Sequence, residues 1–355
     1  MEETTINVIK VFTVGIFSFL LAFSITPTLA DFLYKHRLWK KKSKEKAIDG
    51  KDIKHFRNAH SERESKVPRI GGLIIWVSVV SLIFLFYVLS VIFDYYWFEK
   101  LNFLSRDQTW LPLFTLVSAA LVGLTDDLLQ IVDKIKSKYI ENGLNLRYRL
   151  FLVALIGFVG SWWFYFRLDQ SFVYVPFAGE IFFGLFYIPL FIIVMIAVYS
   201  GGVIDGIDGL SGGTFALIFT AYTAIALFQG QINLAAFCLA IVGSILAFLW
   251  FNIPPARFYM GETGVIGLTA TLTVVAFLTN GVFVLPIIAI LLVITSASVI
   301  IQLIAKRLFN RKVFLAAPLH HHFEAKGWPH YKITMRFWII GVVAAIFGVV
   351  IHFLS

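Results

Sequence analysis

Charged residues are scarce in this chain of 355 residues, since Asp, Glu, Lys and Arg together make up only 14% of it. Soluble domains carry about 25%. Hydrophobic residues make up 59%, and the mean hydropathy is +0.83. These values exclude a water-soluble globular domain. Cysteine is nearly absent as well: the single Cys238 lies in an apolar run, so the chain forms no internal disulfide and this side chain is expected to serve packing.

Long apolar runs are abundant instead. Ten of them reach the roughly 17–25 residues that a membrane-spanning helix needs. The runs are continuous, whereas a membrane barrel would show short alternating strands, so we predict helices. The expected fold is an all-α polytopic membrane protein, with ten transmembrane helices in one integral membrane domain over residues 1–355. The predicted spans are about 6–30, 70–93, 111–129, 150–166, 181–200, 212–228, 233–250, 264–279, 282–304 and 337–354.

The basic residues set the expected orientation. Of the 30 lysines and arginines, 26 fall in loops that ten crossings place on one face of the membrane, namely 31–69, 130–149, 251–263 and 305–336. By the positive-inside rule this face is cytoplasmic, and both termini lie outside. The net charge of +9 is therefore explained by the orientation of the chain in the membrane. No aromatic-and-basic module for nucleic acid is present, and the lipid bilayer is the expected partner of loop 31–69.

Acidic residues gather in three clusters at the ends of predicted spans, all on the basic face. Carboxylates are costly in lipid and by default indicate functional sites. Mg²⁺ prefers oxygen ligands, often one or two carboxylates together with substrate phosphates. Neighbouring glycines would let a bulky substrate approach backbone N–H groups. The clusters are Asp126 with Asp127, Asp205 with Asp208, and Glu262 after Gly261.

Structural explanations exist for each cluster taken alone. Asp205 and Asp208 also suit turn and N-cap positions, and Asp126 suits a helix boundary. Adjacent Asp126 and Asp127, however, cannot both ionise cheaply without a cation or a basic partner nearby. Because all three clusters share one face with the histidine segment, a site for a divalent cation is the better interpretation.

Residues 318–328 form a polar segment that contains His320, His321 and His322, three of only eight histidines. Imidazoles supply donors, acceptors or partial positive charge near neutral pH, which suits a phosphate site. A structural loop and a metal site are the alternatives. Successive helical side chains diverge by about 100°, so three adjacent histidines do not easily share one ion.

A polar break between two predicted spans contains Asn252 and Tyr259. An aromatic face beside an amide can serve as a platform for a nucleobase. Aromatic side chains at a membrane interface are common, and they give Tyr259 an alternative role.

These motifs together resemble the bacterial phospho-N-acetylmuramoyl-pentapeptide transferase family. The segment 318–328, followed by residues 336–339, is similar to its histidine motif and is the most specific part. The carboxylate clusters, Asn252 and the loop ending at 68–72 occur in the family's order and spacing. The resemblance covers roughly residues 60–340. It implies transfer of a sugar-phosphate from UDP-N-acetylmuramoyl-pentapeptide to undecaprenyl phosphate in the bacterial cytoplasmic membrane, with Mg²⁺, giving lipid I and UMP.

The resemblance also implies roles for single residues. Glu262 takes the position of the metal-binding aspartate. Asp126 or Asp127 would activate or orient the lipid phosphate. Asp205 and Asp208 would hold the nucleotide-sugar end of the substrate or organise the metal shell.

The remaining implied contacts are to the nucleotide. His320, His321 and His322 would contact the diphosphate, and Tyr259 would stack on uracil, with Asn252 and Gly261 also at the substrate.

The chain departs from the family pattern at several positions. Glu262 replaces an aspartate, Gly202 stands where asparagine is usual, and Gln130 stands where lysine is usual. Losing an amide and a cation near a diphosphate costs transition-state stabilisation unless another group compensates. Arg69 and Arg149 are the candidates for that compensation.

Two other functions compete with the leading one. The chain could use a different UDP-N-acetylhexosamine, or it could be a non-catalytic lipid-binding or transport homologue. The sequence leaves the oligomeric state open, because an apolar seam between spans would serve a homodimer or a lipid groove equally well.

Overall fold

The computed structural model describes residues 3–39, 67–105, 107–131 and 143–355. Most of the predicted loop 31–69 and part of loop 130–149 lie outside these residues. Within the described part, ten helices are long and apolar enough to cross a membrane. This confirms the predicted all-α polytopic fold. The elements are α1 (Glu3–Lys35), α3 (Leu73–Ile92), α4 (Tyr96–Leu101), α5 (Trp110–Ile131), α6 (Leu146–Arg167), β1 (Phe172–Val175), β2 (Gly179–Phe182), η1 (Gly184–Phe186), α7 (Tyr187–Ser200), η2 (Gly201–Ile204), α8 (Leu210–Phe228), α9 (Ile232–Asn252), α10 (Gly261–Leu278), α11 (Leu285–Ile288), α12 (Ile290–Phe309), α13 (Leu319–Ala325) and α14 (His330–Leu354).

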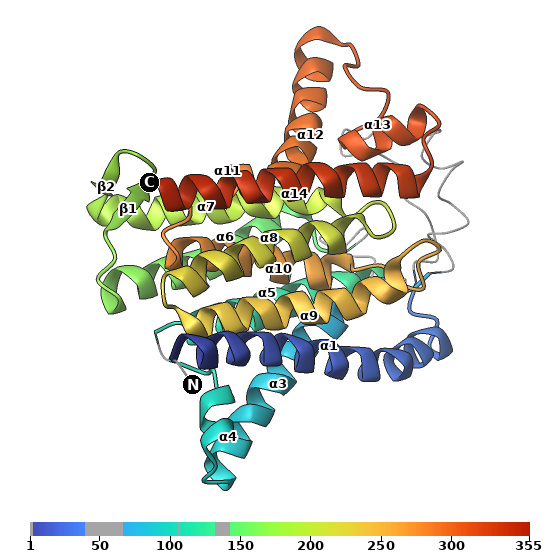
Figure 1. The fold of residues 1–355 in the computed structure, drawn as a ribbon. Helices are drawn as coiled ribbons and strands as arrows, with labels where there is room; N and C mark the ends of the chain where they lie inside the picture. Colours follow the sequence, from blue (N-terminus) through green and yellow to red (C-terminus); the bar gives the residue numbers. More distant parts are fainter. Residues whose placement is uncertain (1–2, 40–66, 106, 132–142) are drawn as a thin grey trace.

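Most of the long helices lie side by side in a bundle (Figure 1). Both termini lie at one end of the bundle, and the short helix α13, which carries the histidines, lies toward the other end (Figure 1). An even number of crossings places the two termini on the same side of a membrane. The histidine segment therefore lies away from both termini along the bundle.

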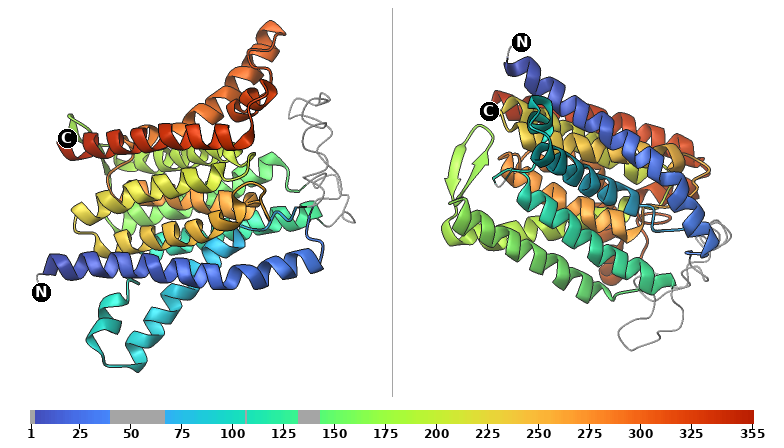
Figure 2. Two further views of the ribbon diagram at one scale, coloured as in Figure 1. Left: turned by 45° about the vertical axis from the view of Figure 1, so that its right-hand side comes forward. Right: turned by 90° about the horizontal axis from the view of Figure 1, so that it is seen from below.

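The centre of the bundle is formed by α8, α9 and α10, and the peripheral helices surround them (Figure 2). In α10, 89% of the most apolar 18-residue window is buried, against 22% in α14. The sequence of α10 suits this position because its small residues allow neighbouring backbones to approach. The hydroxyls of Thr269 and Thr271 donate to the carbonyls of Val265 and Gly267, at 2.7 Å each, so burial leaves no unpaired donor on these threonines.

Glycine allows α5 to lie directly against the start of α10. A Cβ added to Gly123 on α5 would lie 2.1 Å from the carbonyl oxygen of Glu262 and 2.7 Å from the Cα of Thr263. Both contacts are with backbone, which cannot rotate away. Gly72, directly before α3, is also close to Gly264 of α10, because its Cβ would lie 2.3 Å from the backbone nitrogen. The beginning of α10 is therefore enclosed by two other chain segments.

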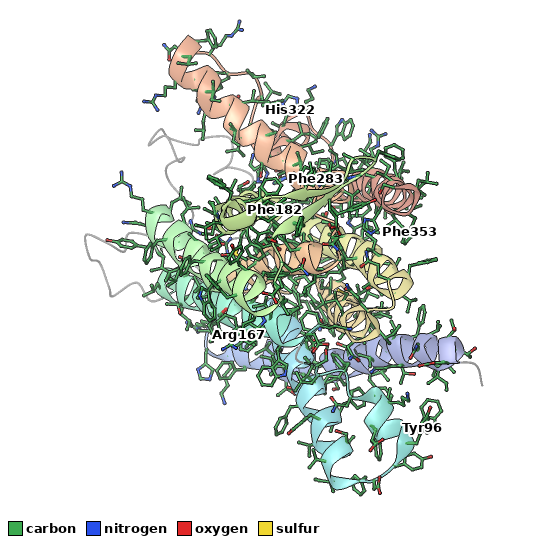
Figure 3. All side chains as sticks on the ribbon, turned by 90° about the vertical axis from the view of Figure 1, so that its left-hand side faces the viewer. Tyr96, Arg167, Phe182, Phe283, His322 and Phe353 are labelled. Atoms are coloured by element: carbon green, nitrogen blue, oxygen red, sulfur yellow. The ribbon has the colours of Figure 1, made fainter. Side chains whose placement is uncertain are left out.

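Two parts of the chain project from the bundle. Helix α12 points away on one side, and α3 with α4 extends on the opposite side (Figure 1). Figure 3, viewed from the end that carries both termini, labels His322 beside the projecting α12 and Tyr96 on the projecting α4. The predicted ninth span, 282–304, is wrong in detail: the structure has the short α11, a break at Ala289, and then α12 continuing to Phe309.

The hydropathy pattern did not predict the short elements. An antiparallel hairpin pairs Phe172 with Phe182 and Val175 with Gly179 across β1 and β2. Helix α4 (Tyr96–Leu101) is six residues long and has no buried residue. Segments this short contain too few residues for a hydrophobic period to stand out.

The Gly123 contact gives a testable prediction about stability. Gly123→Ala should destabilise the protein by about 1–3 kcal/mol, the usual range for an added methyl in a well-packed contact. The readout is the melting temperature of the purified protein in detergent. Gly160→Ala on α6 is the matched control, since its Cβ would meet only the ring of Phe191 at 3.3 Å. Equal melting temperatures for the two variants would contradict the proposed backbone contact.

Candidate active site

Two carboxylates from other parts of the chain cap the start of α10. Asp127 of α5 accepts the backbone N–H groups of Glu262 (3.2 Å) and Thr263 (2.8 Å) and the hydroxyl of Thr263 (2.7 Å). Asp205 accepts the N–H of Gly261 at 3.1 Å. The first N–H groups of a helix lack partners within the helix and form its positive end. Asp127 and Asp205 therefore have a clear structural role here.

Gly261 is required by this arrangement. Its φ is +70°, in the left-handed region, and an added Cβ would lie 2.0 Å from the carbonyl oxygen of Arg69 and 2.6 Å from Asp127 Oδ2. Asp205 also accepts the hydroxyl of Ser211 at 2.7 Å. Burial raises the pKa of the Asp205 carboxyl, while the Ser211 hydrogen bond and the charge of Arg69 act in the opposite direction.

Asp126 faces a different set of partners from its neighbour Asp127. It is fully buried. Its Oδ1 accepts the N–H of Leu144 at 2.5 Å, and its Oδ2 accepts the amide of Gln130 at 2.6 Å. Arg149 of α6 lies 3.5 Å from Asp126 Oδ2 and 2.6 Å from Glu262 Oε1. Adjacent helical residues point about 100° apart, which explains how the two aspartates reach different partners.

The loop between η2 and α8 is fastened to the loop before α10. Asn252 accepts the N–H of Gly209 at 2.9 Å and donates to the carbonyl of Phe258 at 2.8 Å, so both ends of its amide are engaged by backbone. Asp208 accepts the N–H of Ala256 at 3.2 Å. In this structure these two predicted site residues hold the loops together.

The first-loop ending lies against the same segment. Tyr259 donates its N–H to the carbonyl of Pro68 at 2.8 Å and accepts the N–H of Gly71 at 2.9 Å. Gly72 donates to the carbonyl of Met260 at 2.8 Å. These bonds bring Arg69 beside the start of α10, as the proximity of its carbonyl to Gly261 requires.

Two of the three histidines lie over the loop that carries Asp205. A Cβ added to Gly206 would lie 2.6 Å from His320 Nε2 and 2.9 Å from His321 Nε2, so only glycine leaves room for both rings. His320 and His321 are buried, and their ring centroids are 4.3 Å apart. The structure thus brings the histidine motif and the middle carboxylate cluster together, as predicted.

His322 points elsewhere. Its Nδ1 accepts the N–H of Leu315 at 3.1 Å, and its ring packs edge-on against Phe314 at 5.6 Å. Burial, with a smaller contribution from Lys326, lowers the pKa of His322. His322 therefore does not join His320 and His321 beside Gly206 in this structure, because helical geometry turns each successive side chain by about 100°.

Glu324 is a site residue that the motif contained but the sequence argument did not single out. Its Oε2 lies 2.8 Å from His321 Nδ1, and its Oε1 lies 2.8 Å from His330 Nε2. The carboxylate orients the His321 ring so that Nε2 faces Gly206. The signal available in the sequence was the three-residue spacing of His321 and Glu324, which places both on one helix face.

The structure also explains two residues that depart from the family pattern, Gly202 and Gln130. A Cβ on Gly202 would lie 2.3 Å from Val265 Cγ1, so an asparagine there would not fit against α10 without movement. Gln130 reaches Asp126 as an uncharged donor, and Arg149 supplies the positive charge beside it.

Asp126 and Glu262 are the residues that could hold a divalent cation. Both approach the same Arg149 nitrogen, so a single positive charge can lie between them. Their donors are all oxygen, which fits a hard cation such as Mg²⁺. Among the described residues, no group of three or more His, Cys, Asp or Glu side chains is arranged for a metal. Further ligands would have to come from substrate phosphates or water.

Comparison with known proteins agrees with the resemblance noted from the motifs. Glycosyl transferase family 4 matches residues 109–280. The phospho-N-acetylmuramoyl-pentapeptide-transferase of Chloroflexus aggregans is 35% identical over 296 residues, covering 79% of this chain and 76% of the relative. Those of Geobacillus sp. (strain WCH70) and Clostridium perfringens are each 32% identical, covering 95% and 94% of this chain and 96% of each relative.

Sequence identity of this size over nearly the whole length agrees with the ten candidate membrane-spanning helices and with the order of the motifs. The chain therefore belongs to the phospho-N-acetylmuramoyl-pentapeptide-transferase family, as a multi-pass protein of the bacterial inner membrane.

Proposed function

We propose that this protein transfers phospho-N-acetylmuramoyl-pentapeptide from its UDP-linked donor to undecaprenyl phosphate, giving lipid I and UMP for peptidoglycan synthesis. The observation that carries this proposal is the meeting of three carboxylate clusters and two histidines around the start of α10. The likeness to relatives named for this activity supports it. The basic loops support a site on the cytoplasmic face, where the soluble donor is made available.

The chemistry is a phosphoryl transfer. An oxygen of the lipid phosphate attacks the sugar-bearing phosphorus of the donor. The bond from that phosphorus to the bridging oxygen breaks, and its electron pair leaves with UMP. Such a reaction needs mainly positioning of the reactants and neutralisation of charge. A site that joins carboxylates, arginines and imidazoles at the end of a membrane bundle supplies both.

We assign the metal to Asp126 and Glu262. When bound there, Mg²⁺ would neutralise charge on the diphosphate. Asp127 and Asp205, whose oxygens are occupied by the first N–H groups of α10, fix the position of Glu262. In the same way Asp208 and Asn252 position the loops.

We assign the substrate contacts to the cationic and imidazole groups. The Nε2 atoms of His320 and His321 face Gly206, where a diphosphate could be bound, and Arg69 and Arg149 would balance its charge. Tyr259, held by its backbone beside Pro68, remains our candidate for stacking on uracil. Helices α12 and α14 both contact α13, and their exposed apolar residues suit contact with lipid, so the lipid substrate can approach from the bilayer.

Donor specificity is the direct test of this function. Purified protein with Mg²⁺ and undecaprenyl phosphate should release UMP with UDP-N-acetylmuramoyl-pentapeptide and not with UDP-N-acetylglucosamine. Release of UMP with the second donor alone would favour the related transferase. No release with either donor would favour a non-catalytic lipid-binding or transport protein.

Glu262→Gln should abolish Mg²⁺-dependent turnover, because it removes the charge of the proposed ligand while keeping its size. We expect kcat to fall by on the order of 100-fold or more, as for other losses of transition-state charge stabilisation. UMP release at a series of Mg²⁺ concentrations measures the effect. Glu180→Gln, on the exposed strand β2, is the matched control and should behave as wild type. Turnover of Glu262→Gln within a few-fold of wild type would remove the metal assignment.

Glu324→Gln should lower kcat with a smaller change in KM, because the His321 ring loses the carboxylate that orients it. We expect a fall of about 10- to 100-fold, the range found when carboxylates that orient metal-bound histidines are removed. His330→Asn removes the other partner of Glu324 and leaves the His321 contact in place. The two variants are compared by steady-state kinetics. If His330→Asn costs as much as Glu324→Gln, the orientation of His321 is not the cause.

A further inference from the structure

Arg149 lies where a shared cation would lie. One of its nitrogens, Nη1, is 2.6 Å from Glu262 Oε1 and 3.5 Å from Asp126 Oδ2. Without a positive charge between them, the two carboxylates would repel each other. Gln130 contributes only an uncharged amide to Asp126. Within residues 107–131 and 143–355, Arg149 is the cation that contacts both carboxylates.

The backbone of Glu262 is fixed, so its side-chain length decides what it reaches. Its N–H donates to Asp127, and its carbonyl lies where a Cβ on Gly123 would collide. The carboxylate of an aspartate here would end one methylene earlier. The longer glutamate side chain spans the gap to Arg149 on α6 and forms the 2.6 Å ion pair.

The ion pair between Arg149 and Glu262 is placed so that another cation can replace the guanidinium. The Arg149 and Glu262 side chains are 20% and 29% exposed, so water weakens their attraction. The Nε of Arg149 is buried, and it has no hydrogen-bond partner among residues 3–39, 67–105, 107–131 and 143–355. A buried donor left in this way favours other positions of the guanidinium. A divalent cation would bind the same carboxylate oxygens more strongly than one guanidinium nitrogen does.

We propose that Arg149 is a resident counter-ion of the metal site, which competes with the divalent cation for Glu262 and leaves that carboxylate when the cation binds. The proposal rests on the metal assignment made above. The released guanidinium stays anchored on α6 beside Asp126, at the edge of the site, where an anionic diphosphate can take it up. The ion pair thus balances negative charge on the two carboxylates.

Binding of Mn²⁺ alone, without nucleotide or lipid phosphate, tests the competition. Electron paramagnetic resonance of free Mn²⁺ gives the dissociation constant of the purified protein. Arg149→Gln should bind Mn²⁺ about fivefold more tightly, the size of effect expected from losing one partly exposed ion pair. Arg147→Gln is the matched control, because it removes the same charge from an exposed position two residues earlier on α6. It should leave binding unchanged within about twofold.

A second variant keeps the test informative if Arg149→Gln does not fold. Glu262→Asp retains the carboxylate but shortens its reach to Arg149, so it too should bind Mn²⁺ more tightly. Where Arg149→Gln does fold, the same change in that background should add nothing, since the competitor is already gone. Unchanged or weaker binding by Arg149→Gln or by Glu262→Asp would overturn the proposal.

Glu262→Gln separates this inference from the function on which it rests. If Glu262→Gln abolishes Mn²⁺ binding while Arg149→Gln leaves it unchanged, the metal assignment stands and only the competition is wrong. If Glu262→Gln binds Mn²⁺ as wild type does, the metal lies elsewhere, and both the assignment and the competition are wrong.

Discussion

The site depends on the capping of α10 by carboxylates from elsewhere in the chain. A helix that begins at the end of a crowded bundle needs acceptors for its first N–H groups, and here Asp127 and Asp205 provide them. The same bonds fix α5, the loop before α8 and α10 relative to one another. Gly123 and Gly261 allow this approach, since a side chain at either position would collide with backbone. The position of Glu262 follows from helix capping before any ligand is considered.

Capping also gives the neighbouring Asp126 and Asp127 different roles, although they are adjacent in the sequence. Asp127 is taken up by the helix, whereas Asp126, about 100° further round α5, meets Arg149 and Gln130. Departures from the family pattern fit this division. A neutral Gln130 is compatible with a buried carboxylate because Arg149 brings the charge from α6, and Gly202 is compatible because Val265 already fills the space beside it.

The sequence predicted the fold well, and it predicted the site only in outline. Hydropathy is a sum over about 20 residues, so it found ten spans although individual boundaries moved and α12 began after a break. The gathering of the carboxylates and histidines at one end followed from loop alternation. What each side chain contacts depends on the rotation of a helix and on single atoms, and no linear pattern specifies these. Two contacts that the sequence therefore could not predict are the packing of His322 against Phe314 and the hydrogen bonds of Asn252 to two backbone groups.

Both halves of the site hold groups that are matched in charge or in hydrogen bonding. Arg149 lies between Asp126 and Glu262 on one side, and Glu324 lies between His321 and His330 on the other. Unbalanced charge at the end of a membrane bundle would be costly, and these pairs avoid it. Under the proposed function, a diphosphate and a cation that bind here exchange partners with groups already in contact. Such exchange would draw on groups that are already held in place, which is the preorganisation that stabilising charge in a transition state requires.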